Sequence, residues 1–397
     1  MSVRKRTWTT KGVEKTAWIV DYVDGSDTRR LKTFKTKKEA DTFAATAHLE
    51  VRDGNHVADS ASVTVEVAGK LWLAARERAG RERTTIDQYR QHLDLHIVPF
   101  IGGSKLTTLN ASTLHAFRER LQDEGRSQAM VKKVMVSLGS LIADAQDRGL
   151  VSRNVVHEMR GRLGASDGRA ALRAKAKLRV GVDIPAPSEI KAIVGALEGR
   201  WRPLLLTAIF TGLRASELTG LTWPDVDLTK KVLHVRQRAD RYKEIGRPKT
   251  GAGDREVPLT PMVVNTLRQW KLAGTKSDTG LVFPNLKGKP EALQPIVRDG
   301  YQAAQMRGGV VVASGKLDAA GKPLTLAKYT GLHSIRHFYA SWCINRRADG
   351  GLELPGKVVQ ERLGHSSITM TMDTYGHLFP RGDDGEEMAA AERALLL

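Results

Sequence analysis

Two short segments near the C-terminal end hold side chains that can act together on a phosphate group. GLHSIRH places His333 and Arg336 three positions apart, and LGHSSITMTMDTYGH places His365 and Tyr375 ten positions apart. An arginine binds phosphate through paired N–H groups, and a histidine can exchange a proton near neutral pH. A tyrosine hydroxyl beside such cations can serve as a nucleophile. The two segments therefore predict attack by a tyrosine on a phosphodiester.

Two upstream segments can extend this set. TGLRASEL contains Arg214, with Glu217 three residues further on the same helical face. This spacing predicts a phosphate-binding guanidinium held by a supporting carboxylate, although a simple surface ion pair gives the same pattern. PKTGAGDREVPL places Lys249 in a loop between two predicted strands. A lysine whose pKa is lowered by neighbouring cations can act as a general acid, and a solvated hairpin lysine is the alternative.

Metal and nucleotide chemistry are not indicated. His333 and its neighbouring histidines have no cysteine or carboxylate partner at a zinc-site spacing. We expect His337, next to Arg336, to point away from the site. The chain has no G-x-x-x-x-G-K-[ST] loop, so ATP use is not expected. We therefore predict that the reaction needs no cofactor and no metal.

The charge of the chain favours a polyanionic partner. Its 397 residues include 63 Lys and Arg against 44 Asp and Glu, a formal net charge of +19. The single cysteine, Cys343, excludes an intrachain disulfide and indicates a reducing compartment. No apolar run approaches the roughly 20 residues of a membrane span, and no apolar signal region follows the basic N-terminus. We expect a cytoplasmic, nucleoid-associated protein with no membrane partner.

The elements that must position these residues begin with a small domain over residues 1–56. TAWIVDYV and RRLKTFKT read as two strands, and KKEADTFAATAHLEVRDG reads as one helix ended by Gly54. Basic side chains crowd the hairpin, which favours a DNA-binding role over that of a structural cap. The predicted DNA contacts of this domain are Arg29, Arg30, Lys32 and Lys35.

Apolar spacing of three and four residues then predicts a bundle of four or five helices over residues 62–163. Asn110 and Ser127 are expected to cap two of its helices. Residues 164–186 are small and basic, which predicts a linker between domains; a solvated helix is the alternative. The predicted phosphate contacts of the linker are Arg173, Lys175 and Lys177.

Residues 187–380 predict a mixed α+β domain, followed by a C-terminal tail over residues 381–397. KVLHVRQRAD and REVPLT are strand-like and flank a loop rich in Gly and Lys, and GGVVVASGKLDAAGKPLTLA predicts a further hairpin. The tail predicts a short acidic helix. The expected fold is thus multidomain and mainly α with small β elements.

The ordered segments TGLRASEL, PKTGAGDREVPL, LHSIRH and LGHSSITMTMDTYGH resemble the tyrosine recombinase family of phage-type integrases. The resemblance implies a catalytic domain of that type at residues 187–380, a helical core-binding domain and an arm-type N-terminal domain. It implies that Tyr375 forms a 3′-phosphotyrosyl link and frees a 5′-hydroxyl. The activating residues that it implies are Arg214, Lys249, His333, Arg336 and His365.

The resemblance also implies binding partners and a mobile genetic element. The partners are double-stranded attachment-site DNA, further copies of the chain in a homotetramer on synapsed DNA, an excisionase and a DNA-bending host protein. The chain would integrate and excise a phage or genomic island. The segments around residues 300–330 and RRADGGLELPGK are longer than the family minimum, but neither removes a catalytic position. Two other functions are alternatives. A type IB-like topoisomerase shares this residue set. A decayed integrase acting as a DNA-binding regulator would show damaged catalytic positions, and none is missing from this sequence.

Overall fold

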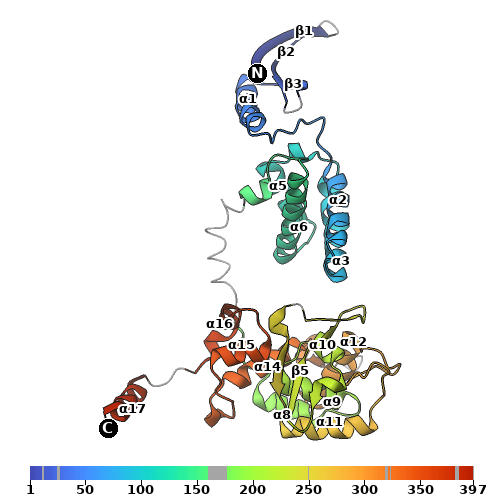
Figure 1. The fold of residues 1–397 in the computed structure, drawn as a ribbon, viewed down its shortest axis with the longest axis vertical. Coiled ribbons are helices and arrows are strands. Elements are labelled where there is room, and N and C mark those ends of the chain that lie inside the picture. Colours follow the sequence, from blue (N-terminus) through green and yellow to red (C-terminus); the bar gives the residue numbers. More distant parts are fainter. Residues whose placement is uncertain are drawn as a thin grey trace. The chain divides into compact units, whose positions relative to one another are not determined.

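The chain divides into two compact units, residues 1–175 and residues 176–397. The structure is a computed structural model, drawn in Figure 1. It describes residues 1–10, 13–24, 27–159, 177–248, 250–317, 321, 323–380 and 384–396.

A three-stranded antiparallel sheet in the order β1-β2-β3 opens the first unit. Its strands and the helix that follows are β1 (Ser2–Thr10), β2 (Val13–Val23), β3 (Arg29–Phe34) and α1 (Lys37–Arg52). Val20 and Tyr22 of β2 pack with Ala40 of α1 in a small core. The two predicted strands and the helix are present. We did not predict β1, because its basic side chains are almost all exposed and show no buried alternation.

The rest of the first unit is a helical bundle. It consists of α2 (Val65–Arg78), α3 (Arg83–His92), the π-helical turn η1 (Leu93–Ile97), α4 (Val98–Ile101), η2 (Leu106–Thr108), α5 (Ala111–Asp123) and α6 (Gln128–Asp147). Asn110 and Ser127 cap α5 and α6 as predicted, each accepting a hydrogen bond from the backbone N–H three residues on. Trp72, Leu114 and Leu138 lie in its buried core. None of the described helices is long and apolar enough to cross a bilayer.

The second unit combines helices with three short sheets. Its helices are α8 (Pro187–Gly195), α9 (Trp201–Thr211), α10 (Ala215–Gly220), α11 (Pro261–Ala273), α12 (Leu293–Pro295), the π-helical η5 (Ile296–Gln302), α13 (Ala303–Arg307), α14 (His333–Ile344), α15 (Gly356–Leu363), α16 (Ile368–Tyr375) and α17 (Asp384–Leu396). Its 3-10 turns are η3 (Trp223–Asp225), η4 (Gly251–Gly253), η6 (Arg347–Asp349) and η7 (Gly376–Leu378). Its strands are β4 (Val226–Asp227), β5 (Val232–Val235), β6 (Arg238–Ala239), β7 (Ile245–Gly246), β8 (Arg255–Pro258), β9 (Val311–Leu317) and β10 (Pro323–Ala327).

The two strands predicted around the basic loop are neighbours in one sheet. The strand order is β4-β5-β8, and Leu233 of β5 faces Val257 of β8. The loop that joins β5 to β8 carries the short β6-β7 pair. The predicted later hairpin is the β9-β10 pair. The tail forms the helix α17.

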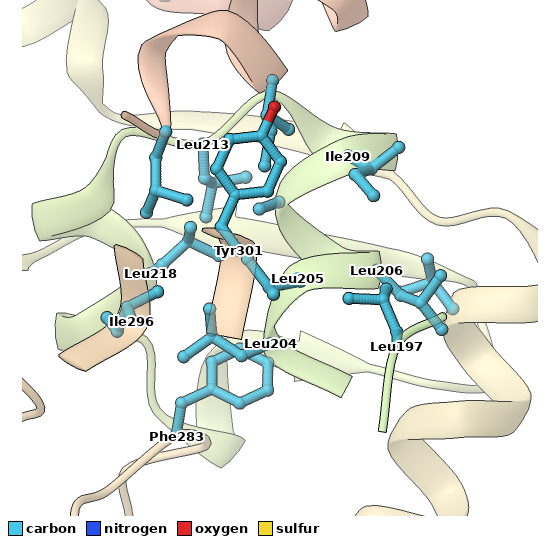
Figure 2. Packing of buried hydrophobic residues seen from close by; sticks show 14 of the residues in the cluster. Leu197, Leu204, Leu205, Leu206, Ile209, Leu213, Leu218, Phe283, Ile296 and Tyr301 are labelled. Carbon is cyan, nitrogen blue, oxygen red and sulfur yellow. The ribbon is translucent and has the colours of Figure 1, made fainter. Parts of the chain in front are cut away.

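The core of the second unit is built around α9, whose residues are buried on nearly every side. Figure 2 shows the ring of Tyr301 among leucines of α9, including Leu204 and Leu205. The hydroxyl of Tyr301 is hydrogen-bonded to that of Ser334 at 3.0 Å, near the start of α14. The core therefore reaches directly to the helix that begins at His333. Helices α14, α15 and α16 pack in sequence beside it (Figure 1).

Candidate active site

Arg214 follows a turn that only glycine can form. Helix α9 ends at Gly212, whose φ of 61° is left-handed, and a Cβ there would lie 2.3 Å from the ring of Tyr339. Arg214 then caps α10 at its N-terminus. Its backbone N–H donates to Oε2 of Glu217 at 2.9 Å, and its Nη1 donates to Oε1 at 2.8 Å. The Arg214–Glu217 pair expected from the spacing is present, with the carboxylate buried.

Glu217 is shared with a second arginine that the sequence did not reveal. Arg255, the first residue of β8, donates from Nη2 to Oε2 of Glu217 at 2.9 Å and from Nη1 to Oε1 at 3.2 Å. Burial alone would raise the pKa of the Glu217 carboxyl. The hydrogen bonds and charge of Arg255, followed by those of Arg214, outweigh burial and hold that pKa below its usual range. Glu217 is therefore an ionised, buried carboxylate between two guanidiniums.

Three consecutive backbone carbonyls at the end of α15 each accept a hydrogen bond from a different arginine. The C-terminal carbonyls of a helix lack partners within the helix and carry its negative dipole end, so they attract cations. The donors and acceptors are Arg255 Nε to Arg362 O at 2.8 Å, Arg336 Nη2 to Leu363 O, and Arg214 Nη2 to Gly364 O at 3.1 Å.

Helix α14 carries both His333 and Arg336. Arg336 is buried and also donates from Nη1 to the carbonyl of Gly212 at 2.6 Å. Burial and the nearby charge of Arg214 lower the pKa of Arg336 to about 9, so its guanidinium is still charged at pH 7. Burial, then Arg336 and Arg214, lower the pKa of His333. At pH 7 the imidazole of His333 is therefore neutral.

Tyr375 is the last residue of α16, and only 2% of it is exposed. Its hydroxyl and Nδ1 of His337 form a hydrogen bond of 2.7 Å. Burial raises the pKa of Tyr375 to about 12, although the charges of Arg336 and Arg214 act in the opposite direction. The phenol is therefore protonated at pH 7.

The expectation that His337 points away from the site is wrong. His333 and His337 are four residues apart on one face of α14, and their ring centroids are 6.0 Å apart. Burial, then His333 and Arg336, lower the pKa of His337 to about 4, so its neutral ring can accept the hydrogen bond of Tyr375. The i, i+4 spacing from His333 was the available signal that His337 lies on the same face of α14.

His365 lies beside the nucleophile candidate. Gly364 ends α15 with a φ of 63°, and a Cβ there would lie 2.8 Å from Nη1 of Arg255. Nδ1 of His365 is hydrogen-bonded to the hydroxyl of Thr371 at 2.9 Å, and its ring is parallel to that of Tyr375 at 6.3 Å between centroids. Burial, then Arg336, Arg214 and Arg255, lower the pKa of His365 to about 4.

The structure thus gathers six of the predicted residues in one site: Arg214, Glu217, His333, Arg336, His365 and Tyr375. Lys249 lies outside the described residues, so its predicted role stays a prediction. Arg255 and His337 are the additions. Arg255 had no local signal, because its contacts lie 38 and 107 residues away in sequence.

The basic residues predicted to contact DNA in the N-terminal domain are mostly paired with acidic groups. Arg29 donates to both carboxylate oxygens of Asp21, and Arg30 donates to Asp24. The ammonium of Lys32 lies 2.6 Å from the carboxylate of its partner, Asp59.

The other basic residues predicted to contact DNA are Lys35 and three residues of the predicted linker. Lys35 is exposed and has no ion-pair partner in the part of the chain that the structure describes. In the predicted linker, Arg173 and Lys175 lie outside the described residues, and Lys177 is exposed. The predicted DNA contacts of all seven basic residues stay predictions.

The amino-acid sequence matches known proteins over most of its length. The model of the phage integrase family matches residues 186–381. A protein of Caldanaerobacter subterraneus subsp. tengcongensis described as "Tyrosine recombinase XerC-like" is 29% identical over 365 residues, which is 87% of each chain. The ICEBs1 integrase of Bacillus subtilis (strain 168) is 24% identical over 366 residues, or 91% of each chain.

Solved structures show the same fold. The Tn1549 transposon integrase in complex with a circular-intermediate DNA aligns with a TM-score of 0.60 and 19% identity, covering 84% of this chain and 100% of the other. A lambda integrase in a tetramer bound to a Holliday junction aligns with a TM-score of 0.54 and 18% identity, covering 91% and 96%. These likenesses confirm the predicted fold, mainly helical and multidomain with a small N-terminal sheet. The family match and the sequence relatives identify this chain as a member of the phage integrase family and a tyrosine recombinase.

Proposed function

We propose that the chain is a site-specific DNA recombinase in which Tyr375 is the nucleophile. The observation that carries this proposal is the setting of that tyrosine. It is buried beside His337 and His365, and the charges of Arg336 and Arg214 act on it. Such cations stabilise the charge that develops on a phosphate during attack by an oxygen nucleophile.

In the proposed reaction, Oη of Tyr375 attacks the scissile phosphorus and the bond from phosphorus to the 5′-oxygen breaks. The phenol proton passes to a neutral imidazole beside the site. The leaving 5′-oxygen takes a proton from the general acid, a role that we assign to Lys249 from the family resemblance. The 3′-phosphotyrosyl link keeps the energy of the broken bond, so a 5′-hydroxyl from another strand can reverse the step.

The side chains that we assign to the reaction already have hydrogen-bond partners within the protein. Arg214 and Arg336 donate to backbone carbonyls, and the Tyr375 hydroxyl is held by His337. A scissile phosphate would replace carbonyl oxygens as an acceptor for these guanidiniums. Because Tyr375 is almost fully buried, DNA binding must also expose its hydroxyl.

We further propose that the recombination integrates and excises a phage or genomic island. The relatives support a mobile element, since they include the ICEBs1 integrase and a prophage integrase of Escherichia coli (strain K12). The proposed partners are double-stranded attachment-site DNA, three further copies of the chain in a synaptic tetramer, an excisionase and a DNA-bending host protein. The lambda integrase tetramer on a Holliday junction supports this assembly.

The test is the variant Tyr375→Phe on a nicked duplex that carries the junction between the element and its host chromosome. The variant should bind this duplex as the wild type does and form no covalent adduct. Tyr329→Phe is the matched control, because it also removes a buried hydroxyl, one that is bonded to Glu189. An undiminished adduct with Tyr375→Phe would exclude Tyr375 as the nucleophile. Relaxation of a plasmid without the junction sequence, with no strand exchange, would indicate a type IB-like topoisomerase.

A further inference from the structure

The arginine cluster has fewer negative charges than positive ones. Arg214, Arg255 and Arg336 meet at the end of α15, and the carboxylate of Glu217 is bonded to two of them, Arg214 and Arg255. Three guanidiniums and one carboxylate leave two positive charges on these four side chains. The backbone carbonyls satisfy N–H groups but carry no net charge, so they do not cancel this excess.

Arg255 occupies a different place in the cluster from Arg214. Its side chain is 6% exposed, whereas that of Arg214 is 37% exposed. Each of its three guanidinium nitrogens already donates to the protein, to Glu217, to the carbonyl of Gly253 and to the carbonyl of Arg362. To contact DNA, Arg255 would have to release the buried carboxylate of Glu217, while Arg214 can turn part of its guanidinium outward.

We propose that Arg255 is a positioning residue for strand cleavage, acting through Glu217 and the end of α15. Its charge neutralises Glu217, which leaves Arg214 and Arg336 as uncompensated cations for the scissile phosphate. Its hydrogen bond to Arg362 holds the turn from which His365 projects. This inference rests on the proposed function, because it concerns the same phosphodiester reaction.

The pairing of Glu217 supports this division of roles. Arg255 holds the carboxylate with two hydrogen bonds, one to each oxygen, while the Arg214 guanidinium supplies a single one. The carboxylate also responds more strongly to Arg255 than to Arg214, as the cause of its lowered pKa shows. Without Arg255, the buried carboxylate would pair with Arg214 alone and cancel the charge that the phosphate needs.

The consequence is specific to the chemical step. Negative charge on the phosphate grows as the tyrosine attacks, so the loss of one net positive charge raises the barrier more than it weakens DNA binding. Replacing a residue that only anchors the fold would instead lower the free energy of unfolding, whatever the charge of its neighbours. Removing the charge of Glu217 therefore distinguishes a positioning role of Arg255 from a purely structural one.

The experiment compares Arg255→Met, Arg255→Lys, Glu217→Gln and the double variant Arg255→Met/Glu217→Gln. The readout is the single-turnover rate of adduct formation at saturating protein on the nicked junction duplex, with DNA affinity measured separately. Arg255→Met should lower the rate by about 100-fold, in the range found for removal of one transition-state charge partner. The double variant should recover about 10-fold or more of that loss, because its charge balance is restored. Arg255→Lys, which keeps the charge but not the paired hydrogen bonds, should lie between Arg255→Met and wild type.

A second readout uses a duplex with a neutral methylphosphonate at the scissile position. This linkage lacks one negative charge, so the deficit of Arg255→Met relative to wild type should shrink on it. Arg200→Met is the matched control, because Arg200 also binds a carboxylate, that of Glu291, and a carbonyl, that of Pro284. This control should cleave at the wild-type rate. Thermal unfolding of every variant verifies that it is folded at the assay temperature.

The outcomes distinguish this inference from the proposed function. A wild-type protein that forms no adduct would overturn the proposed function itself. If the wild type reacts, a normal rate for Arg255→Met or a double variant no faster than Arg255→Met would overturn the role of Arg255 alone. If Arg255→Met does not fold, Arg255→Gln takes its place, because glutamine also lacks the charge but can still hydrogen-bond. Its deficit must be larger on the phosphate than on the methylphosphonate, and equal deficits would overturn the proposal.

Discussion

The N-terminal sheet and the catalytic unit both concentrate arginines, but they hold them in opposite ways. On the sheet, Arg29 pairs with Asp21, which Arg4 also approaches, and Arg30 pairs with Asp24; the side chain of Arg29 is 69% exposed. At the end of α15, the buried Arg336 donates to backbone carbonyls, and Arg255 divides its hydrogen bonds between carbonyls and Glu217. Among the described residues, Glu217 is the one carboxylate bonded to this cluster.

This difference shows that an arginine can have its hydrogen bonds satisfied without having its charge cancelled. An exposed arginine beside its own aspartate gains little stability and offers little net charge to a polyanion. A buried arginine bonded to carbonyls meets its need for acceptors, because a buried N–H without a partner is costly. It nevertheless keeps its positive charge for a ligand. Substitutions in both regions and a change of pH test this contrast.

The largest effect should follow Arg336→Met. This change removes a charge of the cluster and leaves the carbonyls of Gly212 and Leu363 without their donor. Adduct formation should fall by about 100- to 1,000-fold, and the free energy of unfolding by roughly 1–3 kcal/mol. Urea titration and the nicked-duplex assay measure the two effects. Arg336→Lys should restore part of the rate, and an unchanged rate for Arg336→Met would show that the buried charge is not used.

Acidification should weaken the catalytic unit before it weakens the sheet. Burial lowers the pKa values of His337 and His365 to about 4, below the value near 6.5 of an unfolded histidine. Between these values the unfolded chain binds more protons, so stability is complete above about pH 6.5 and is lost as the pH falls towards 4. On the sheet, the hydrogen bond from Arg29 lowers the pKa of Asp21. The stability that the Asp21 carboxylate contributes is therefore lost only at a pH below the usual range of an aspartate.

Hydrogen exchange at pH 7.5 and pH 5, corrected for its intrinsic pH dependence, measures this difference. Amides of α14 and α16 should lose protection equivalent to roughly 1–3 kcal/mol, and those of β2 and β3 should change little. The variant His337→Gln should reduce the pH dependence in α14. Equal protection of α14 at both pH values would contradict the burial of neutral histidines.

On the sheet, Lys35→Gln should weaken DNA binding more than Arg29→Gln does. Lys35, just after β3, is exposed and has no acidic partner among the described residues, whereas Arg29 is bound by both carboxylate oxygens of Asp21. Replacing a lysine that contacts a phosphate should lower the slope of log affinity against log salt by about one. Titrations of the wild type and both variants at several salt concentrations give the slopes. A larger loss of slope for Arg29→Gln than for Lys35→Gln would show that Arg29, rather than Lys35, contacts a phosphate.

The smallest effect should be that of Arg29→Gln on stability. Both partners of this ion pair have access to solvent, and such pairs contribute little to folding. The urea midpoint of the variant should stay within error of the wild type, in contrast to that of Arg336→Met. A clear drop in the midpoint would mean that the sheet depends on its surface charges.

The sequence predicted those parts of the site that depend on local spacing. The three-residue separation of Arg214 and Glu217 indicated their pair, and Asn110 and Ser127 were recognisable as helix caps. The four-residue spacing of His333 and His337 likewise indicates that both lie on one face of α14, but the contact of His337 with Tyr375 joins residues 38 positions apart and has no local signal.

Other features were beyond sequence patterns for physical reasons. The bonds of Arg255 join strand β8 to α10 and α15, and no periodicity reports contacts between distant segments. Backbone carbonyls as partners of the arginines are equally invisible, because every residue has one. Strand β1 lacks a buried face, so its sequence carried no alternation to recognise.

The end of α15 also acts as a template for the arginines. Successive residues of a helix are related by a rise of 1.5 Å and a turn of about 100°, so the carbonyls of Arg362 and Leu363 follow helix geometry, and the left-handed turn at Gly364 directs the third. Arginines from three distant parts of the chain take their mutual spacing from that one helix end. The segment RRADGGLELPGK before α15 can therefore vary in length without changing the spacing. A side chain at Gly364 would instead displace the guanidinium of Arg255, and a changed turn would move the carbonyl that holds Arg214.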